Sequence, residues 1–202
     1  MGLFWKKKKN ETDISNEDHE LRIELGTLEN GVLELREGIT KLDDESLDEY
    51  KHLRKIIFPS SLVEIEDGVI HHQPLLEELD FSRVTQVKKI PDNFIEGDTL
   101  IQNLVIPRGV LSVGDCFLGE CKAGVSVFIP DSVKELERIN GDRENNVFVY
   151  LFAPNVDLCN VEEDVKCFYV PSEYYFSYAE QLKECESKAM LRDMPEEVKG
   201  TY

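Results

Sequence analysis

Four aspartates recur along the chain at nearly constant spacing, and carboxylates arranged in this way could bind a cation. Asp44, Asp67, Asp92 and Asp115 are separated by 23, 25 and 23 residues. If successive segments stack like neighbouring strands, these carboxylates lie about 5 Å apart. Ca²⁺ takes several oxygen ligands and could bind such a column. The sequence favours the alternative, in which each aspartate accepts a backbone N–H and caps a short helical turn.

Other reactive side chains form no pattern that predicts catalysis or a metal centre. The sequence contains no glycine-rich phosphate loop, no HExxH, no GxSxG and no CxxC. His71 and His72 are the only adjacent histidines, and a metal site needs three or four converging ligands. We therefore expect a solvated loop at the two histidines. We also expect a protein that is not an enzyme, without catalytic residues, metal or cofactor.

The five cysteines favour packing roles over disulfides. Their number is odd and none precedes Cys116, unlike the disulfide framework of a small secreted domain. Cys159 falls in a column of inward aliphatic positions and is expected to act as a small hydrophobe. These features predict a reducing, cytoplasmic setting.

Apolar side chains on successive strands are expected to point outward, where they could bind a partner. Exposed apolar stripes usually mark interaction surfaces. The alternative is that a terminal segment or loop folds over them. The candidate binding residues are Ile57, Val105, Phe128 and Leu151.

A repeat of about 23 residues positions all of these side chains. Its clearest copy is "LVIPRGVLSV", and the third copy carries two extra residues and no proline. Fixed-period similarity of this kind is the signature of stacked repeat units. The copies occupy residues 33–42, 56–65, 79–90, 104–113, 127–136 and 150–159.

Three apolar columns run through the copies. The first is Leu33, Ile56, Leu79, Leu104, Val127 and Tyr150. The second is Leu35, Phe58, Phe81, Ile106, Ile129 and Phe152. The third is Leu42, Ile65, Ile90, Val113, Leu136 and Cys159. The first two columns lie two positions apart, so both face one side of a short strand. The pattern predicts a right-handed solenoid of about six coils with a parallel sheet along one side.

The repeat resembles the BspA-like leucine-rich repeats. The pattern L-x-x-I-x-I-P-x-x-V-x-x-I-G-D-x-x-F-x-x-x-C is carried by Ile101, Leu104, Ile106, Pro107, Val110, Val113, Gly114, Asp115, Phe117 and Cys121. The resemblance covers about residues 32–182, and "FYVPSEYYFSYAEQL" is similar to the ending of that family. It implies an adhesive or recognition module, a buried Cys121, and the microbial cell surface as the alternative location.

The ends of the solenoid have their own signals. Asn30-Gly31, between alternating segments, predicts a type I′ hairpin that caps the first coil. An amphipathic segment after Ser172 predicts a closing helix. The expected organisation is a mobile charged segment at 1–20, one solenoid at 21–186 with caps at 21–35 and 172–186, and a tail at 187–202.

The charge of the chain restricts its partners. There are 41 Asp and Glu against 23 Lys and Arg, a formal net charge of −18, so nucleic acid is disfavoured. A protein partner is expected, and a basic one would suit this charge. The segment "GLFWKKKK" at 2–9 gives an alternative function, a peripheral membrane adaptor. No apolar run is long enough to span a bilayer, and the order of residues at 1–10 is unlike a secretory signal.

Overall fold

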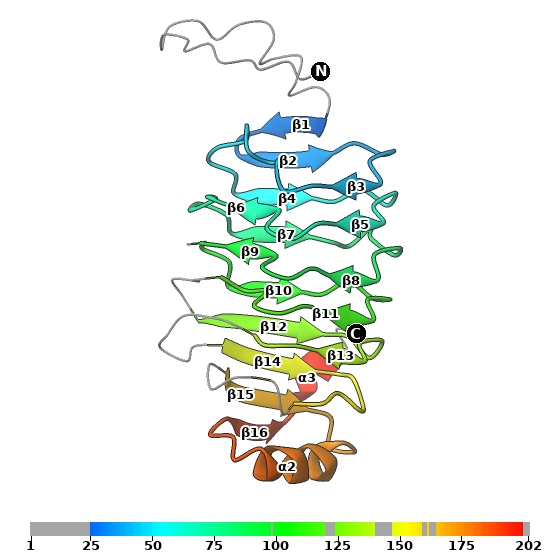
Figure 1. Ribbon diagram of the computed structural model, residues 1–202, viewed down its shortest axis with the longest axis vertical. Helices are drawn as coiled ribbons and strands as arrows, with labels where there is room; N and C mark the ends of the chain where they lie inside the picture. The colour runs from blue at the N-terminus through cyan, green and yellow to red at the C-terminus, as the bar shows by residue number, and fades with distance from the viewer. Residues whose placement is uncertain are drawn as a thin grey trace, which may run out of the picture.

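The structure is a computed structural model that describes residues 25–97, 99–119, 124–139, 147–158, 161 and 165–199. The chain winds into an elongated stack of coils, with its first strand and its main helix at opposite ends (Figure 1). Neighbouring strands pair in parallel across successive coils. The predicted leucine-rich-repeat solenoid of about six coils is confirmed.

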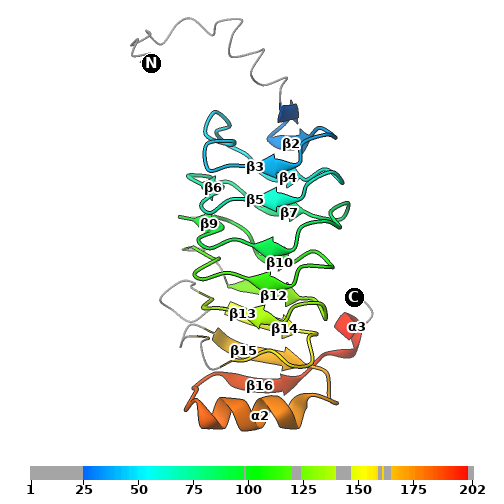
Figure 2. The ribbon, with the colours of Figure 1, turned by 45° about the vertical axis from the view of Figure 1, so that its right-hand side comes forward.

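A main parallel sheet runs along one side of the stack. Its strands are β2 (Val32–Leu35), β4 (Lys55–Ile57), β7 (Glu78–Asp80), β10 (Asn103–Val105), β12 (Val125–Ile129), β14 (Val147–Leu151), β15 (Val165–Val170) and β16 (Met190–Asp193). They form two hydrogen-bonded blocks, which follow one another along the stack (Figure 2). The first block runs from β1 through β2 and β4 to β7, and the second from β10 to β16.

Two further rows of very short strands complete each coil. The second row contains β3 (Lys41–Leu42), β5 (Glu64–Ile65), β8 (Lys89–Ile90), β11 (Ser112–Val113) and β13 (Glu135–Leu136). The third row contains β6 (Ile70–His71) and β9 (Ile95–Glu96). Some of these pairings join the two blocks of the main sheet, because β8 pairs with β11.

The three inward columns are buried as predicted through the first five coils. Ile56, Leu104 and Val127 are fully buried, as is Phe58 of the second column. All belong to one continuous hydrophobic core. The repeat places these side chains inside because the strand period of two returns every second residue to the same face.

In the sixth coil the predicted register is wrong by one residue. Val127 pairs with Val149, 22 residues later, and Ile129 pairs with Leu151. Val149 and Leu151 are therefore the buried positions, and Tyr150, which was expected inside, points outward. A one-residue slip moves every side chain of a strand to the other face. Cys159, the expected inward residue further along this coil, lies outside the described residues.

An antiparallel hairpin covers the first coil. β1 (Gly26–Glu29) pairs with β2, and Glu29 lies opposite Val32. The two turn residues, Asn30 and Gly31, have φ values of 51° and 80°. A type I′ turn requires positive φ at both positions, which explains this dipeptide.

A helix covers the other end. α2 (Tyr175–Glu184) starts after Tyr174 without a side-chain cap, so the predicted cap at Ser172 is wrong. Tyr174 N donates to the Pro171 carbonyl instead, and this turn leads into the helix. The buried Tyr178 attaches the helix to the preceding coil: its hydroxyl donates to Ala153 O at 2.6 Å and accepts from Val156 N at 3.1 Å.

The segment after α2 was expected to be a tail, and this expectation is wrong for residues 187–199. β16 pairs in parallel with β15 over four residues, and Met194 is buried. A short helix, α3 (Glu196–Lys199), follows. β16 is held by backbone hydrogen bonds to β15. The side-chain pattern of this highly charged segment does not indicate those bonds. The expected mobile segment at 1–20 lies outside the described residues. Within the described residues, no helix is long and apolar enough to cross a membrane.

Candidate protein-binding face

Alternate side chains of the main strands point away from the core, and one column of them runs along the open face of the sheet. In the first block this column is Glu34, Ile57 and Asp80. In the second block it is Val105, Phe128, Tyr150, Tyr169 and Arg192. The open face therefore has a charged half and an aromatic half.

The aromatic half carries a row of stacked rings, which we call the aromatic ridge: Phe128, Tyr150 and Tyr169. The ring centroids of Phe128 and Tyr150 are 4.6 Å apart, and those of Tyr150 and Tyr169 are 4.7 Å apart. The rings are within 10° of parallel. Because their flat faces cover one another, ring edges and phenol groups remain to face solvent. Burial raises the pKa of Tyr169, and a protonated phenol is a hydrogen-bond donor as well as an acceptor.

Cations and apolar side chains surround the ridge. Val105, at one end, is 42% exposed, and Lys166 Nζ lies 5.6 Å from the centre of the Phe148 ring. The five strands of this block contain one carboxylate, Asp193, at the last position of β16. This half of the face thus differs sharply from a chain with a net charge of −18.

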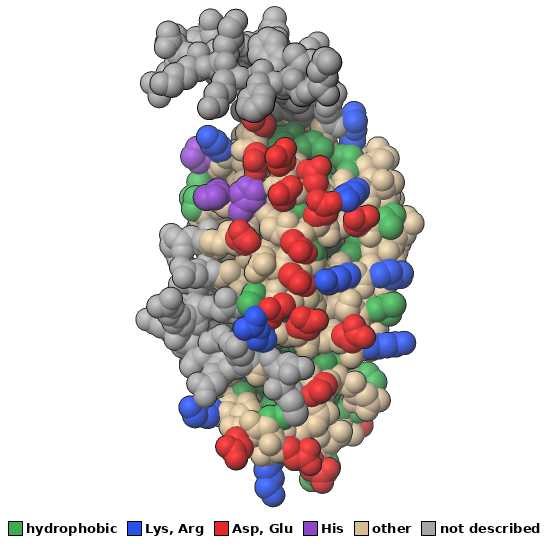
Figure 3. All heavy atoms as spheres, in the orientation of Figure 1, with side chains coloured by type: hydrophobic (Ala, Val, Ile, Leu, Met, Phe, Trp, Pro, Cys, Tyr) green, Lys and Arg blue, Asp and Glu red, His purple; other side chains and the backbone are tan. Residues whose placement is uncertain are grey.

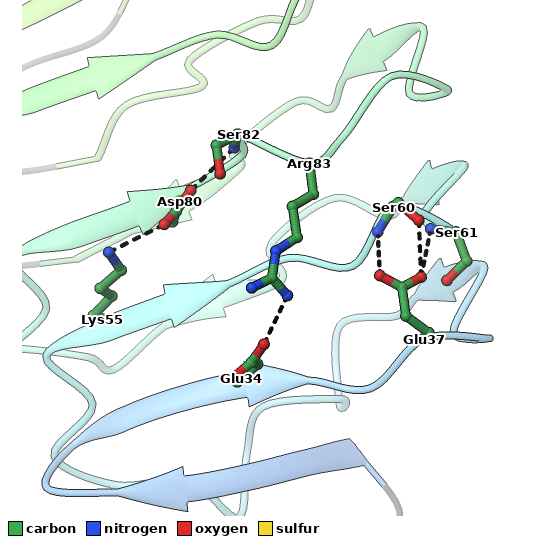
Figure 4. Close-up of polar contacts among 8 residues, drawn as sticks. All are labelled: Glu34, Glu37, Lys55, Ser60, Ser61, Asp80, Ser82 and Arg83. Carbon is green, nitrogen blue, oxygen red and sulfur yellow. Dashed lines mark hydrogen bonds and ion pairs between the residues drawn. The ribbon is translucent and has the colours of Figure 1, made fainter.

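The charged half is held by ion pairs between neighbouring coils (Figure 4). Lys55 Nζ lies 2.7 Å from Glu78 Oε1 and 3.1 Å from Asp80 Oδ2. The bond to Glu78, followed by that to Asp80, raises the pKa of Lys55. Partial burial acts against ionisation of Asp80, but hydrogen bonds from Ser82 and Lys55 outweigh it and lower its pKa.

A second contact in Figure 4 links the turns that follow the strands. Glu37 accepts hydrogen bonds from Ser60 N at 3.0 Å and Ser61 N at 3.2 Å. These bonds lower the pKa of Glu37, those from Ser60 most strongly. Arg83 reaches across two coils to Glu34, at 2.7 Å. Sequence reasoning missed these contacts, although Lys55–Glu78 and Glu37–Ser60 join residues 23 apart, which is the period of the repeat.

The four predicted binding residues do not form one stripe. Val105 is exposed, and Phe128 and Ile57 are half-buried on the open face. Leu151 is fully buried, so its assignment to the stripe is wrong, and Tyr150 takes its place. Ile57 lies in the charged half and is separated from the ridge by Asp80 and by the break in the sheet.

A groove opens where the two blocks of the sheet meet. Its volume is about 990 Å³, and it lies between β7 and β10. Its apolar lining includes Leu79, Phe81, Leu100, Val105 and Ile106. The two extra residues of the third copy precede β10, so the strand spacing of the repeat is lost at this point. The sequence showed the longer copy but not the groove.

The aspartate column caps no helical turn in the structure. Each of Asp67, Asp92 and Asp115 opens a tight turn whose second residue, Gly68, Asn93 or Cys116, has a positive φ. Asp92 Oδ1 accepts a hydrogen bond from Asp115 N, one coil further on. The predicted capping of a helical turn is therefore wrong: Asp92 does accept a backbone N–H, but its donor belongs to the next coil, and Asp115 bonds Arg138.

Carboxylates are nevertheless concentrated on the surface. Figure 3 shows acidic side chains gathered in a band along the molecule. A hollow of about 660 Å³ is lined by Asp44, Glu64, Glu66 and Asp67, together with Lys88 and Lys89. Among the described residues, no group of three or more possible ligands could hold a metal ion.

His71 makes more specific contacts than the predicted solvated loop. Its Nε2 lies 2.6 Å from Asp48 Oδ1, and its Nδ1 lies 2.8 Å from the Gly68 carbonyl. Both neighbouring atoms are acceptors, so the ring satisfies both when each nitrogen carries a proton. The bond to Gly68, and then that to Asp48, raises the pKa of His71.

The cysteines differ from the prediction at one position. Cys185, at the end of α2, is disulfide-bonded, so the expectation of reduced cysteines is wrong there. Cys116 and Cys167 are free. Cys121 lies outside the described residues.

Comparison with known proteins identifies the repeat. The model of the BspA type leucine rich repeat region matches residues 27–140, with six copies. No curated protein and no solved structure matches the chain. The family match covers more than half of the chain, and the stacked parallel coils agree with it. The chain belongs to the family of BspA-type leucine-rich repeat proteins.

Proposed function

We propose that the protein is a non-catalytic recognition scaffold that binds a protein partner through the open face of its main sheet. The aromatic ridge, extended by Val105, forms the centre of this interface. The observation that carries the proposal is the stack of three half-exposed rings on a rigid sheet. Tyrosine supplies a large amphipathic contact area at little entropic cost, and aromatic residues dominate binding energy at interfaces.

The rings of the aromatic ridge are better placed to bind a partner than to stabilise the fold. These rings lie outside the continuous core, so they contribute contact area that the fold does not require. Lys166 and Arg192 add donors near the end of the ridge. Family membership supports the same role, since solenoids of this kind present extended surfaces to partners.

The experiment compares partner capture by the wild-type chain with capture by Phe128→Ser and Tyr150→Ser. The partner retained from extract is identified, and its Kd is then measured directly. Removing an aromatic anchor is expected to weaken binding by on the order of 30-fold. Leu111→Ser serves as the control, because Leu111 is equally apolar and 42% exposed but outside the ridge. Equal affinity of all variants would refute the proposal.

The partner's charge follows from the rest of the surface. The acidic band supports a partner with a basic surface, because opposite potentials steer association. The net charge of −18 opposes nucleic acid as the partner.

A peripheral membrane adaptor is the second candidate. It is supported by Phe4, Trp5 and the four lysines at 6–9, which lie outside the described residues. Each basic residue near an anionic bilayer adds about 1 kcal/mol of attraction. Sedimentation with vesicles that contain phosphatidylserine tests this candidate. Loss of binding when the four lysines are changed to serine would support it.

The cellular location of the protein is also a proposal. Disulfides persist in oxidising settings, so the bond at Cys185 supports the cell surface over the cytoplasm that the cysteine count favoured. Alkylation of the protein in intact cells, with and without reductant, distinguishes the two locations.

A further inference from the structure

The groove between β7 and β10 exposes backbone groups that a continuous sheet would cover. Phe58 N donates to Asp80 O, and Glu78 N donates to Arg54 O. The backbone of Glu78 and Asp80 therefore faces β4. Because alternate residues of a parallel strand bond to opposite neighbours, the N–H and C=O of Leu79 face the groove, whereas the C=O of Phe81 accepts a hydrogen bond from Val84 N at 2.9 Å.

The other wall of the groove has the same property. Ile106 N donates to Phe128 O, and Ser126 N donates to Gln102 O, so these residues of β10 face β12. Asn103 and Val105 turn their backbone groups toward β7, with which β10 forms no ladder. Among the residues that the structure describes, backbone groups of Leu79 on one wall and of Asn103 and Val105 on the other are thus available to bond a main chain from another molecule.

Each charged side chain that lines the groove already makes a contact of its own. Glu77 pairs with Arg54 at 3.1 Å. Glu78 and Asp80 share Lys55, and Arg108 is not free either. A charged group that entered the groove would lose water and could gain an opposite charge only by displacing these contacts, which is unfavourable. The groove therefore selects an uncharged occupant.

Exposed apolar side chains lie where such an occupant would pass. Leu100 and Val105 line the groove and are 37% and 42% exposed. Val105 also lies beside Phe128, the first ring of the aromatic ridge. The groove and the ridge thus form one continuous apolar path across β10 and β12.

We propose that an uncharged, extended segment of the protein partner crosses this junction. It places an aliphatic side chain in the groove, bonds its main chain to the free backbone groups of β7 and β10, and continues over Val105 onto the ridge. This inference rests on the proposed function and adds the chemical class of the segment that is bound.

The test selects binders from a phage-displayed library of random short peptides on the intact protein and measures their Kd by fluorescence anisotropy. The enriched peptides are expected to share an uncharged segment that contains Leu, Ile, Val or Met. Leu100→Asp and Val105→Asp should each weaken binding by about tenfold or more. The matched controls are Leu111→Asp and Val63→Asp, whose side chains are 42% and 46% exposed and do not line the groove. N-methylation of the peptide beside its aliphatic residue should also weaken binding.

Several results would overturn the inference. These are enrichment of basic or acidic peptides, absence of any enriched peptide, and affinities that ignore Leu100→Asp and Val105→Asp. Phe128→Ser separates this inference from the proposed function. If Phe128→Ser weakens binding while the two groove variants do not, the open face is the binding surface and the groove inference fails. If none of the three variants changes the affinity, both proposals fail.

Discussion

Single residues in this protein are assigned to core or surface by strict alternation along each strand. Val127 and Ile129 are fully buried, while Phe128 between them stacks on Tyr150 on the open face. The core and the candidate interface therefore share the same strands. A substitution at one position tests the fold, and a substitution at its neighbour tests binding.

Ile129→Asp should destabilise the protein strongly. Ile129 is fully buried and lies opposite Leu151, so a carboxylate there would be an uncompensated buried charge, which costs about 3–5 kcal/mol. Pro130→Ala, at the strand end, should cost about 1 kcal/mol or less. Urea denaturation measures both. Similar midpoints for the two variants would show that the register of this coil is wrong.

His71 should make stability depend on pH. Its folded pKa is raised above the ordinary value of 6.5 by Gly68 O and Asp48. The stabilisation is thus fully present below pH 6.5 and is lost as the pH rises through the folded pKa. Glu96 and the edge-on ring of His72 also face this histidine.

The measurement is the difference in free energy of unfolding between wild type and His71→Gln from about pH 6 to pH 9. The difference should shrink as the pH rises, and Asp48→Asn should reduce its pH dependence. A difference that is constant with pH would contradict the assignment.

At the scale of elements, the sequence predicted most of the coils because their signals are local. Proline after the strand, Asn30-Gly31 in the hairpin and the inward columns each depend on a few adjacent residues. The register of the sixth coil was predicted wrongly because a fixed period of 23 residues was applied to a coil that is one residue shorter. The alternation in "VFVYL" already placed Val149 and Leu151 together on one face. β16 was not predicted because it is held by backbone hydrogen bonds to β15, which leave no pattern in the side chains.

The binding residues were harder to predict than the fold. Val105 and Phe128 could be placed on the open face because their neighbours are plainly inward. The stacking of Tyr150 and Tyr169 depends on a register that includes the bulge between β14 and β15. The groove depends on where the extra residues of the third copy fall in three dimensions, and no local pattern encodes that position.

Tyr178→Phe should loosen the C-terminal helix. The hydroxyl of Tyr178 bonds both Ala153 O and Val156 N in a fully buried position. Its removal leaves a carbonyl and an N–H without this partner, at a cost of about 1–3 kcal/mol. Thermal unfolding measures the loss. Tyr175→Phe is the control, because Tyr175 is only partly buried at the start of the same helix. An equal effect of the two substitutions would show that the hydrogen bonds of the Tyr178 hydroxyl are unimportant for stability.

The whole molecule carries an excess of negative charge, which opposes its compact state. The net charge of −18 is partly relieved by ion pairs between coils, such as those of Lys55. At 0.1 M salt, repulsion between exposed charges more than about 10 Å apart is largely screened. The free energy of unfolding should therefore rise as sodium chloride is added up to about 0.1 M.

Calcium provides the matching whole-molecule test of the aspartate column. If the aspartates serve as backbone acceptors, millimolar calcium should raise the melting temperature no more than magnesium at equal ionic strength. A ligand that binds only the folded state at 100 times its Kd adds about 2.7 kcal/mol. A rise of that size with calcium alone would restore the alternative of a calcium-binding column.

The break between β7 and β10 also determines how the solenoid can bend. The two blocks lack a ladder on the main-sheet side, while β8 still pairs with β11 behind it. We therefore expect the solenoid to bend most easily at this junction, on the side of the groove. Spin labels at Glu29 and Asn103 should therefore give a broader distance distribution than labels at Asn103 and Met190, which span strands of one block. On this expectation, two additional residues in one coil give an otherwise regular rod a place at which it flexes.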